Sequence, residues 1–359
     1  MGETAKIAVL RFSAMGDVAM TAPVLKEFQA NYPDAELVIV SRTLFQPFFA
    51  DINNLTFHAI EPKGRHKGFL GLFRLFRELK SQRITAVADL HNNLRSKVIT
   101  ALFSLSGIKT ATLDKGRAEK KMLTRKENKQ VIPLKLTVQR YADVFGELGF
   151  PFQLKNTLQK PEQEGAIFQG NPGLQKNMDL QESIDIQENS ESKRIGVSPF
   201  AQHLQKVYPF HKLEEVLIQL ATLGHQLFIF GGSAEEEAIA ATWSSKHQNI
   251  TSMVRKTTLE DELELIGNLD LMLSMDSSGM HLASLKNTPV VSVWGATHPY
   301  AGFLGYGQSI NDAVQIDLYC RPCSVYGNVP CYRGDFACMN NLSPQIVVNK
   351  VLDKLKSIR

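Results

Sequence analysis

Apolar runs rich in β-branched residues alternate with amphipathic stretches along most of this chain. Residues 7–12 (IAVLRF) precede residues 21–32 (TAPVLKEFQANY) and residues 36–41 (ELVIVS), and the alternation continues to about residue 113. It starts again at residues 194–200 (RIGVSPF) and runs to residue 295. This pattern indicates βαβ units, which form a mostly parallel sheet with helices on both faces. We therefore predict an α/β protein with two Rossmann-like, doubly wound domains.

The length of the chain also favours two domains. At 359 residues it exceeds the size at which one hydrophobic core usually stops growing. Between the two alternating regions lies a stretch rich in Gln, Glu, Asn and Ser, which is typical of a linker. We predict an N-terminal domain over residues 1–155, a linker over 156–193, a C-terminal domain over 194–340 and a final helix over 341–359.

Composition excludes several classes of protein. Hydrophobic residues make up 43% and charged residues 21% of the chain, as in ordinary globular proteins. The net charge of +4 comes from 40 basic and 36 acidic residues, which does not favour a nucleic-acid partner. A strand-like run begins almost at the first Met, and no stretch of about 18 apolar residues occurs. We expect a cytoplasmic protein without a membrane-spanning helix.

Asp17 stands at the turn between the first predicted strand and the next helix. The turn reads Ser-Ala-Met-Gly-Asp and lacks the three glycines of a dinucleotide-binding turn, which argues against a dehydrogenase. An acid here is typical of a helix start, where the dipole favours it. A carboxylate that follows a strand also suits a general base that accepts a proton from a hydroxyl.

A second polar turn, Asp276-Ser277-Ser278-Gly279-Met280-His281, follows the predicted strand over residues 269–275. Backbone N–H groups at a helix start bind anions, so a diphosphate would fit there. An ordinary serine cap with a half-buried histidine is the alternative.

Two further loops of the second half carry candidate donor-binding groups. The loop at residues 198–209 contains Lys206, which can stabilise a phosphate leaving group or can be a solvated loop lysine. The turn Gly231-Gly232-Ser233-Ala234-Glu235-Glu236 allows close backbone approach, and its acids can bind a ribose.

Basic residues of the first half predict an anionic acceptor site. They lie between residues 63 and 77 and in the turn after the strand at residues 85–90, although basic runs are also common on solvated loops. The candidate acceptor-binding residues are Lys63, Arg65, Lys67 and Arg95.

Taken together, these segments resemble glycosyltransferase family 9, the ADP-heptose:lipopolysaccharide heptosyltransferases. The likeness covers nearly the whole chain and depends on the opening IAVLRFSAMGDVAMTAPVL, the SPFAQHLQKVYP segment, the GGSAEEE turn and MDSSGMHLASL with PVVSVWGATHP. It implies a GT-B architecture with two domains facing a central cleft. It also implies an inverting, metal-independent transfer from an ADP-sugar to a lipopolysaccharide core acceptor.

The resemblance places Asp17 at the base position and Lys206 at the phosphate-stabilising position. It implies that the enzyme meets an anionic glycolipid at the cytoplasmic face of the inner membrane. The implied donor-binding residues are Ala201, Gln202, Glu235 or Glu236, Asp276, Ser277, Ser278, Gly279 and His281. The sequence departs from the family at two of them, because Ser278 replaces a glycine that is displaced to position 279, and Ala201 replaces a frequent hydroxyl residue.

All four cysteines lie near the end of the chain, at Cys320, Cys323, Cys331 and Cys338. A Cys-x-x-Cys pair followed by two more thiols is compatible with a structural zinc site, although the second pair is more widely spaced than usual. Disulfides are uncommon in the cytoplasm. We therefore expect either a structural zinc ion or free thiols, and no catalytic metal.

Two other classes of function fit the same architecture. A sugar-nucleotide epimerase or hydrolase would act on the nucleotide sugar without an acceptor. A non-catalytic nucleotide-sugar-binding protein would catalyse neither reaction. Transfer that depends on an acceptor distinguishes the glycosyltransferase from both.

Overall fold

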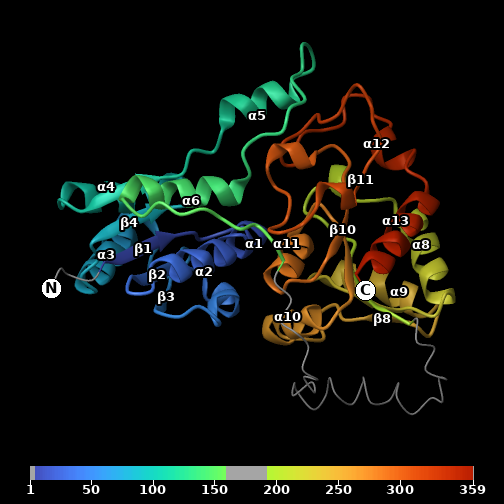
Figure 1. Ribbon diagram of the computed structural model, residues 1–359, viewed down its shortest axis with the longest axis horizontal. Helices are drawn as coiled ribbons and strands as arrows, with labels where there is room; N and C mark the ends of the chain where they lie inside the picture. Colours follow the sequence, from blue (N-terminus) through green and yellow to red (C-terminus); the bar gives the residue numbers. More distant parts are fainter. Residues whose placement is uncertain (1–4, 159–191, 359) are drawn as a thin grey trace. The chain divides into compact units, whose positions relative to one another are not determined.

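The computed structural model describes residues 5–158 and 192–358. The chain forms two compact units, and each is built on one parallel β-sheet (Figure 1). Unit 1 comprises Met1–Glu119 and Leu134–Asn156, and unit 2 comprises Lys120–Pro133 and Thr157–Arg359. Most of the predicted linker, residues 159–191, lies outside the described residues.

Unit 1 contains a five-stranded sheet with the strand order β3-β2-β1-β4-β5, and every pair of neighbours is parallel. Its strands are short, and the three central ones are mostly apolar and buried, as expected where helices cover both faces. They are β1 (Lys6–Leu10), β2 (Glu36–Ser41), β3 (Leu55–Ala59), β4 (Ala86–Asp89) and β5 (Lys109–Thr112).

Helices cover both faces of this sheet. The helices α3 and α4 pack together over one face, where Ala8 and Leu10 of β1 contribute to a buried cluster. The alternate residues of β1, Ile7 and Val9, are also buried and point to the other face. There α2 packs against α6, with the rings of Phe28 and Phe145 4.7 Å apart. The helical segments are α1 (Met15–Ala19), α2 (Thr21–Asn31), η1 (Thr43–Phe49), α3 (Gly68–Ser81), α4 (Leu94–Leu105), α5 (Arg117–Thr124, which ends in unit 2) and α6 (Thr137–Leu148).

Unit 2 contains a six-stranded parallel sheet with the order β11-β10-β9-β6-β7-β8. Its core is formed by β6, β7, β9 and β10 together with α8 and α13, which pack against each other. The strands are β6 (Arg194–Ser198), β7 (Gln226–Ile229), β8 (Ile250–Ser252), β9 (Leu271–Met275), β10 (Val290–Val293) and β11 (Ala313–Val314). The helices are η2 (Leu204–Lys206), α8 (Phe210–Thr222), α9 (Ala234–Ser244), α10 (Leu259–Gly267), α11 (Ser278–Leu285), η3 (Pro299–Ala301), η4 (Ile310–Asp312), α12 (Ala337–Asn340) and α13 (Pro344–Ser357).

One segment of the first 155 residues does not belong to unit 1. Lys120–Pro133 leaves unit 1 and packs with unit 2. The ammonium group of Lys129 donates to the backbone carbonyls of Cys320 and Pro322, at 2.8 Å each. A basic segment has no apolar periodicity that would indicate which core it joins, so the sequence pattern did not predict this exchange.

The prediction of two doubly wound parallel sheets is confirmed. Each sheet reverses its winding direction once, between β1 and β4 in unit 1 and between β6 and β9 in unit 2. Over the parts of the chain that the structure describes, no helix is both long and apolar enough to cross a bilayer.

Candidate active site

The first candidate region lies at the carboxyl ends of β1 and β4 in unit 1. These strands are neighbours at the point where the winding of the sheet reverses. In open parallel sheets, ligands bind at such switch points. Asp17 lies in α1, directly after β1, and His91 lies directly after β4. The structure therefore brings these two turns to the same end of the same pair of strands.

Arg11 holds the Asp17 carboxylate in place. Arg11 Nη2 lies 2.5 Å from Asp17 Oδ2, and Arg11 Nη1 donates to the carbonyl of Leu90 at 2.6 Å. Arg11 is buried, whereas Asp17 keeps 31% of its side chain exposed. A carboxylate that is exposed but already oriented by a buried cation is suited to accept a proton from a substrate.

The turn after β4 is fixed by a buried carboxylate. Asp89 accepts hydrogen bonds from the backbone N–H groups of His91 and Asn92, at 2.9 and 2.8 Å, and from the Ser96 hydroxyl at 2.9 Å. Burial raises the pKa of Asp89 despite these donors. Because its hydrogen-bonding capacity is largely used within the turn, Asp89 has a structural role.

His91 and Lys115 shape the electrostatics around Asp17. Burial and then the charge of Arg11 lower the pKa of His91 to about 3, so the imidazole is neutral at physiological pH. Burial also lowers the pKa of Lys115. The positive charge of Arg11 lowers this pKa further, whereas the negative charge of Asp17 raises it. Sequence reasoning did not name Arg11 or Lys115 among the candidate site residues. The available signal was that Lys115 follows β5, the strand next to β4.

The predicted acceptor-binding residues are not gathered at this switch point. Lys63, Arg65 and Lys67 lie in the loop after β3, which is the edge strand of the sheet and is two positions away from β1. Arg65 is paired with Glu61 at 3.4 Å and with Glu78 at 3.2 Å. Arg95 is exposed in the first turn of α4. This helix follows β4, the neighbour of β1, so Arg95 is the only one of the four that follows a strand at the switch point.

The second candidate region lies at the switch point of unit 2, after β6 and β9. Lys206, in η2, forms an ion pair with Asp276 at 3.1 Å, and both side chains are largely buried. The stem of Lys206 packs against Gly327, where an added Cβ would lie 2.5 Å from Lys206 Cδ. The fold therefore joins two residues that are seventy positions apart in the sequence, and it leaves room for the lysine stem only because residue 327 is a glycine.

The start of α11 has unused hydrogen-bonding capacity. Its N-cap residue, Ser277, makes no side-chain capping bond, and the buried Ser277 Oγ has no hydrogen-bond partner among the described residues. Ser278 is the first residue of the helix, and His281 is buried one turn later. An uncapped N-terminus with a vacant buried hydroxyl suits an anionic ligand.

Gly279 explains the displaced glycine of this turn. A Cβ at this position would lie 2.2 Å from Ser198 Oγ, which is closer than atoms can approach. Only glycine therefore lets α11 start this close to the end of β6. The glycine thus allows close packing between the helix and the strand.

Of the two acids proposed for a ribose, Glu236 is already engaged. Its carboxylate accepts from the backbone N–H groups of Gly232 and Ser233, at 2.7 and 2.9 Å, as part of the capping box of α9. Glu235 is exposed in the same turn and is the remaining candidate.

The other two predicted donor residues lie in the loop after β6. Gln202 is exposed, whereas Ala201 packs partly against the core of unit 2. Both therefore lie on the loop that also carries Lys206.

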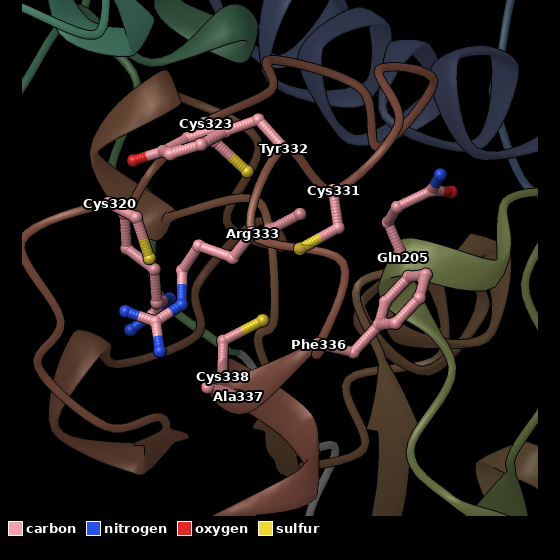
Figure 2. Close-up of a pocket in the computed structure, with 11 residues that line it drawn as sticks. Gln205, Cys320, Cys323, Cys331, Tyr332, Arg333, Phe336, Ala337 and Cys338 are labelled. Carbon is pink, nitrogen blue, oxygen red and sulfur yellow. The ribbon is translucent and has the colours of Figure 1, made fainter.

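The four cysteines line one small cavity, together with Gln205 and Arg333 (Figure 2). All four are free thiols. Burial raises the pKa of Cys338 to about 11, so its thiol is protonated at neutral pH. Among the described residues, no three His, Cys, Asp or Glu side chains are arranged to hold a metal ion. The structural zinc site predicted from the Cys-x-x-Cys spacing is therefore not supported. The four thiols line the same cavity, but they are not arranged as the ligands of one metal ion.

Known proteins are similar to this chain in sequence. The lipopolysaccharide core heptosyltransferase OpsX of Haemophilus influenzae is 25% identical over 305 residues, which cover 82% of this chain and 80% of that protein. The lipopolysaccharide heptosyltransferase 2 of Escherichia coli is also 25% identical over 305 residues, covering 82% and 84%.

Two solved structures support the fold assignment. A glycosyltransferase family 9 protein from Veillonella parvula matches with a TM-score of 0.72 at 18% identity, covering 98% of this chain and 97% of its own. The ADP-heptose lipopolysaccharide heptosyltransferase II of Escherichia coli matches with a TM-score of 0.64 at 19% identity, covering 98% and 99%. The predicted GT-B fold is thereby confirmed.

The family model of glycosyltransferase family 9 (heptosyltransferase) matches residues 72–330, well over half of the chain. This match agrees with the relatives, and it covers the Lys206 loop and the Asp276 turn at the switch point of unit 2. The chain thus belongs to glycosyltransferase family 9, the heptosyltransferase family, and is a glycosyltransferase.

Proposed function

We propose that this enzyme transfers heptose from ADP-heptose to a saccharide of the lipopolysaccharide core, with inversion at the anomeric carbon and without a metal ion. The names of its relatives support the donor and the acceptor class. The observation that carries the proposal is the ion pair of Lys206 and Asp276 beside the uncapped start of α11. This arrangement provides positive charge and N–H donors for a diphosphate leaving group.

On the donor side, the diphosphate of ADP-heptose accepts hydrogen bonds from the first turn of α11 and from Ser277. Lys206 neutralises the charge that develops as the bond between the anomeric carbon and the phosphate oxygen breaks. Asp276 positions Lys206 and binds a sugar hydroxyl. A lysine and a helix N-terminus thus supply the charge that a metal ion provides in other phosphate-handling enzymes.

On the acceptor side, Asp17 accepts the proton of the attacking hydroxyl while that oxygen forms the new bond to the anomeric carbon. ADP leaves with the electron pair of the broken bond, and the configuration of the heptose is inverted. Arg11 keeps the Asp17 carboxylate oriented throughout. We propose that Lys115 and Arg95 bind anionic groups of the acceptor. Lys63, Arg65 and Lys67 follow the edge strand β3 and bind anionic groups of the acceptor that lie farther from Asp17.

The remaining assignments follow the same division. We propose that Ala201 and Gln202 line the nucleotide site, that Glu235 binds the ribose, and that Ser278 and His281 complete the diphosphate and sugar site. Gly279 contributes by allowing α11 to approach β6. We also propose that the enzyme works at the cytoplasmic face of the inner membrane, where a lipid-linked core acceptor is presented.

The test is a transfer assay with purified enzyme, ADP-heptose and deacylated core oligosaccharide. Asp17→Asn should lower kcat by about 10³-fold, within the usual range for loss of a general base, while ADP binding is retained. Asp34→Asn, which alters an exposed acid elsewhere in unit 1, is the matched control and should retain full activity. Turnover of Asp17→Asn near the wild-type rate would show that another group is the base.

Two measurements address the finer parts of the proposal. NMR of the product should show the inverted anomeric configuration, and activity should persist in EDTA. Consumption of ADP-heptose at the same rate without an acceptor would instead support the epimerase or hydrolase alternative.

A further inference from the structure

The exposed side of α3 in unit 1 carries apolar residues where an amphipathic helix is normally polar. The inward side chains Leu72, Leu75 and Leu79 belong to the core. On the outward side, Phe69 and Leu70 are 66% and 83% exposed in the first turn, and Phe73 is 42% exposed in the next. Isolated exposed apolar residues are common, but three large ones on adjacent turns of one helix form a patch.

Basic side chains surround this patch. Arg74 and Arg77 are exposed on the same helix, and Lys63 and Lys67 are exposed on the loop that leads into it. The nearby acids Glu61 and Glu78 both pair with Arg65, so they do not cancel the charge of these four residues. We call the combined set of Phe69, Leu70, Phe73, Lys63, Lys67, Arg74 and Arg77 the α3 surface.

The loop that supplies the lysines is attached to the helix by a buried network. His66 is fully buried, its Nδ1 accepts from the Glu61 backbone N–H at 3.0 Å, and its Nε2 lies 3.1 Å from Glu78 Oε2. Gly71 allows this contact, because a Cβ there would lie 2.3 Å from the His66 carbonyl carbon. The basic and apolar parts of the α3 surface are therefore held together as one preformed unit.

From this combination we propose that the α3 surface docks on an anionic phospholipid bilayer, with Phe69, Leu70 and Phe73 inserted at the interface and the four cations on lipid phosphates. This inference rests on the proposed function, in which the acceptor saccharide is anchored in a membrane. Apolar side chains surrounded by Lys and Arg are the pattern of interfacial membrane binding, because each part matches one layer of the lipid. The loop with Lys63 leaves β3 at the carboxyl edge of the sheet, the edge from which Asp17 follows β1.

The test is co-sedimentation of the full-length protein with vesicles of phosphatidylglycerol and phosphatidylethanolamine. The double variants F69S/L70S and R74Q/R77Q should each lower the partition coefficient by about tenfold. Leu223→Ser, which removes a 57% exposed leucine in unit 2, is the control and should bind as the wild type does. Binding should fall at high salt and on pure phosphatidylcholine.

Activity assays separate docking from chemistry. Both double variants should turn over deacylated, water-soluble acceptor at the wild-type rate but should act more slowly on acceptor embedded in vesicles. Failure of the wild type to sediment, or equal binding by F69S/L70S, would overturn the docking proposal. A change of oligomeric state in F69S/L70S, measured by analytical ultracentrifugation, would also overturn it, since the patch would then be a self-association surface. Selective vesicle binding by an enzyme that shows no transfer to either acceptor would instead refute the proposed function and leave the docking surface intact.

Discussion

The two switch points of this protein are built in opposite ways. In unit 1, the charged groups are paired within the protein, since Arg11 holds Asp17 and the turn donors surround Asp89. In unit 2, Lys206 is paired with Asp276, but the start of α11 has no side-chain cap and Ser277 Oγ lacks a partner among the described residues. The first region holds its carboxylate in a fixed orientation, and the second leaves hydrogen-bonding groups without a partner among the described residues.

This difference matches the chemistry that each unit contributes under the proposed function. A general base must be oriented before the acceptor arrives, because a misdirected carboxylate cannot accept the proton. A diphosphate, in contrast, brings its own acceptor atoms, and donors that the protein had already satisfied could not bind it. Substitutions at four positions, Lys206, Arg11, His91 and Ser277, test this contrast.

Among these four positions, the largest effect is expected at Lys206. Lys206→Met should lower kcat by about 10² to 10³-fold, because the leaving phosphate loses its cation. The variant also leaves the buried Asp276 unpaired, so K206M/D276N should restore stability without restoring kcat. Steady-state kinetics and thermal unfolding of both variants check this, and a kcat within a fewfold of wild type would remove Lys206 from the mechanism.

The next effect concerns Arg11. Arg11→Met should lower kcat by about 10²-fold with little change in the KM for the donor, because the base is misoriented while the donor site in unit 2 is intact. Arg11→Lys retains the charge but carries all its donors on one nitrogen, so it does not reproduce the forked contact with Asp17 and Leu90 and should recover only part of the rate. An increase in donor KM as large as the loss in kcat would contradict the separation of the two sites.

Acid stability provides a third test. The folded-state pKa of His91 is about 3, below the ordinary value of 6.5, so the unfolded chain binds a proton between these values and the folded protein does not. Above about pH 6.5, His91 therefore does not change the free energy of unfolding with pH. As the pH falls from 6.5 toward 3, the free energy of unfolding decreases by up to about 1.4 kcal/mol per pH unit.

The variant for this test is His91→Gln, which retains a hydrogen-bond acceptor but does not titrate. Denaturant unfolding from pH 7 to pH 4.5 should show a shallower loss of stability than in the wild type. His211→Gln, at an exposed position of α8, should leave the slope unchanged. Equal slopes in wild type and His91→Gln would mean that His91 is not buried in its neutral form.

The smallest effect is expected at Ser277. Ser277→Ala should raise the KM for ADP-heptose about fivefold, the equivalent of one hydrogen bond, without lowering the melting temperature. Ser274→Ala is the control, because Ser274 Oγ already donates to the Met275 carbonyl at 2.7 Å. Ser274→Ala should lower the melting temperature but keep the wild-type KM for ADP-heptose. A lower melting temperature and an unchanged KM in Ser277→Ala would mean that the Ser277 hydroxyl does not bind the donor.

Much of the fold followed from local pattern. The alternation of apolar runs predicted both sheets because parallel strands buried on two faces must be continuously apolar. The positions of Asp17 and of the Asp276 turn followed from the rule that parallel strands place their carboxyl ends at one edge. The acceptor-binding role of Lys63, Arg65, Lys67 and Arg95 stays a prediction. The sequence could not place their loops relative to the switch point, because a basic loop after an edge strand has the same sequence signature as one after a central strand.

The sequence by itself determined the α/β class, the two sheets, the strand-to-helix turns that carry Asp17, Lys206 and Asp276, and the family resemblance. These depend on periodicity and on residues adjacent in the chain. Only the tertiary structure decided that Arg11 orients Asp17, that Lys206 meets Asp276, that Lys120–Pro133 packs with unit 2, and that the cysteines line a cavity without a metal-binding geometry. These contacts join residues through strand order and packing. Neither strand order nor packing produces a periodic pattern of residues in the sequence.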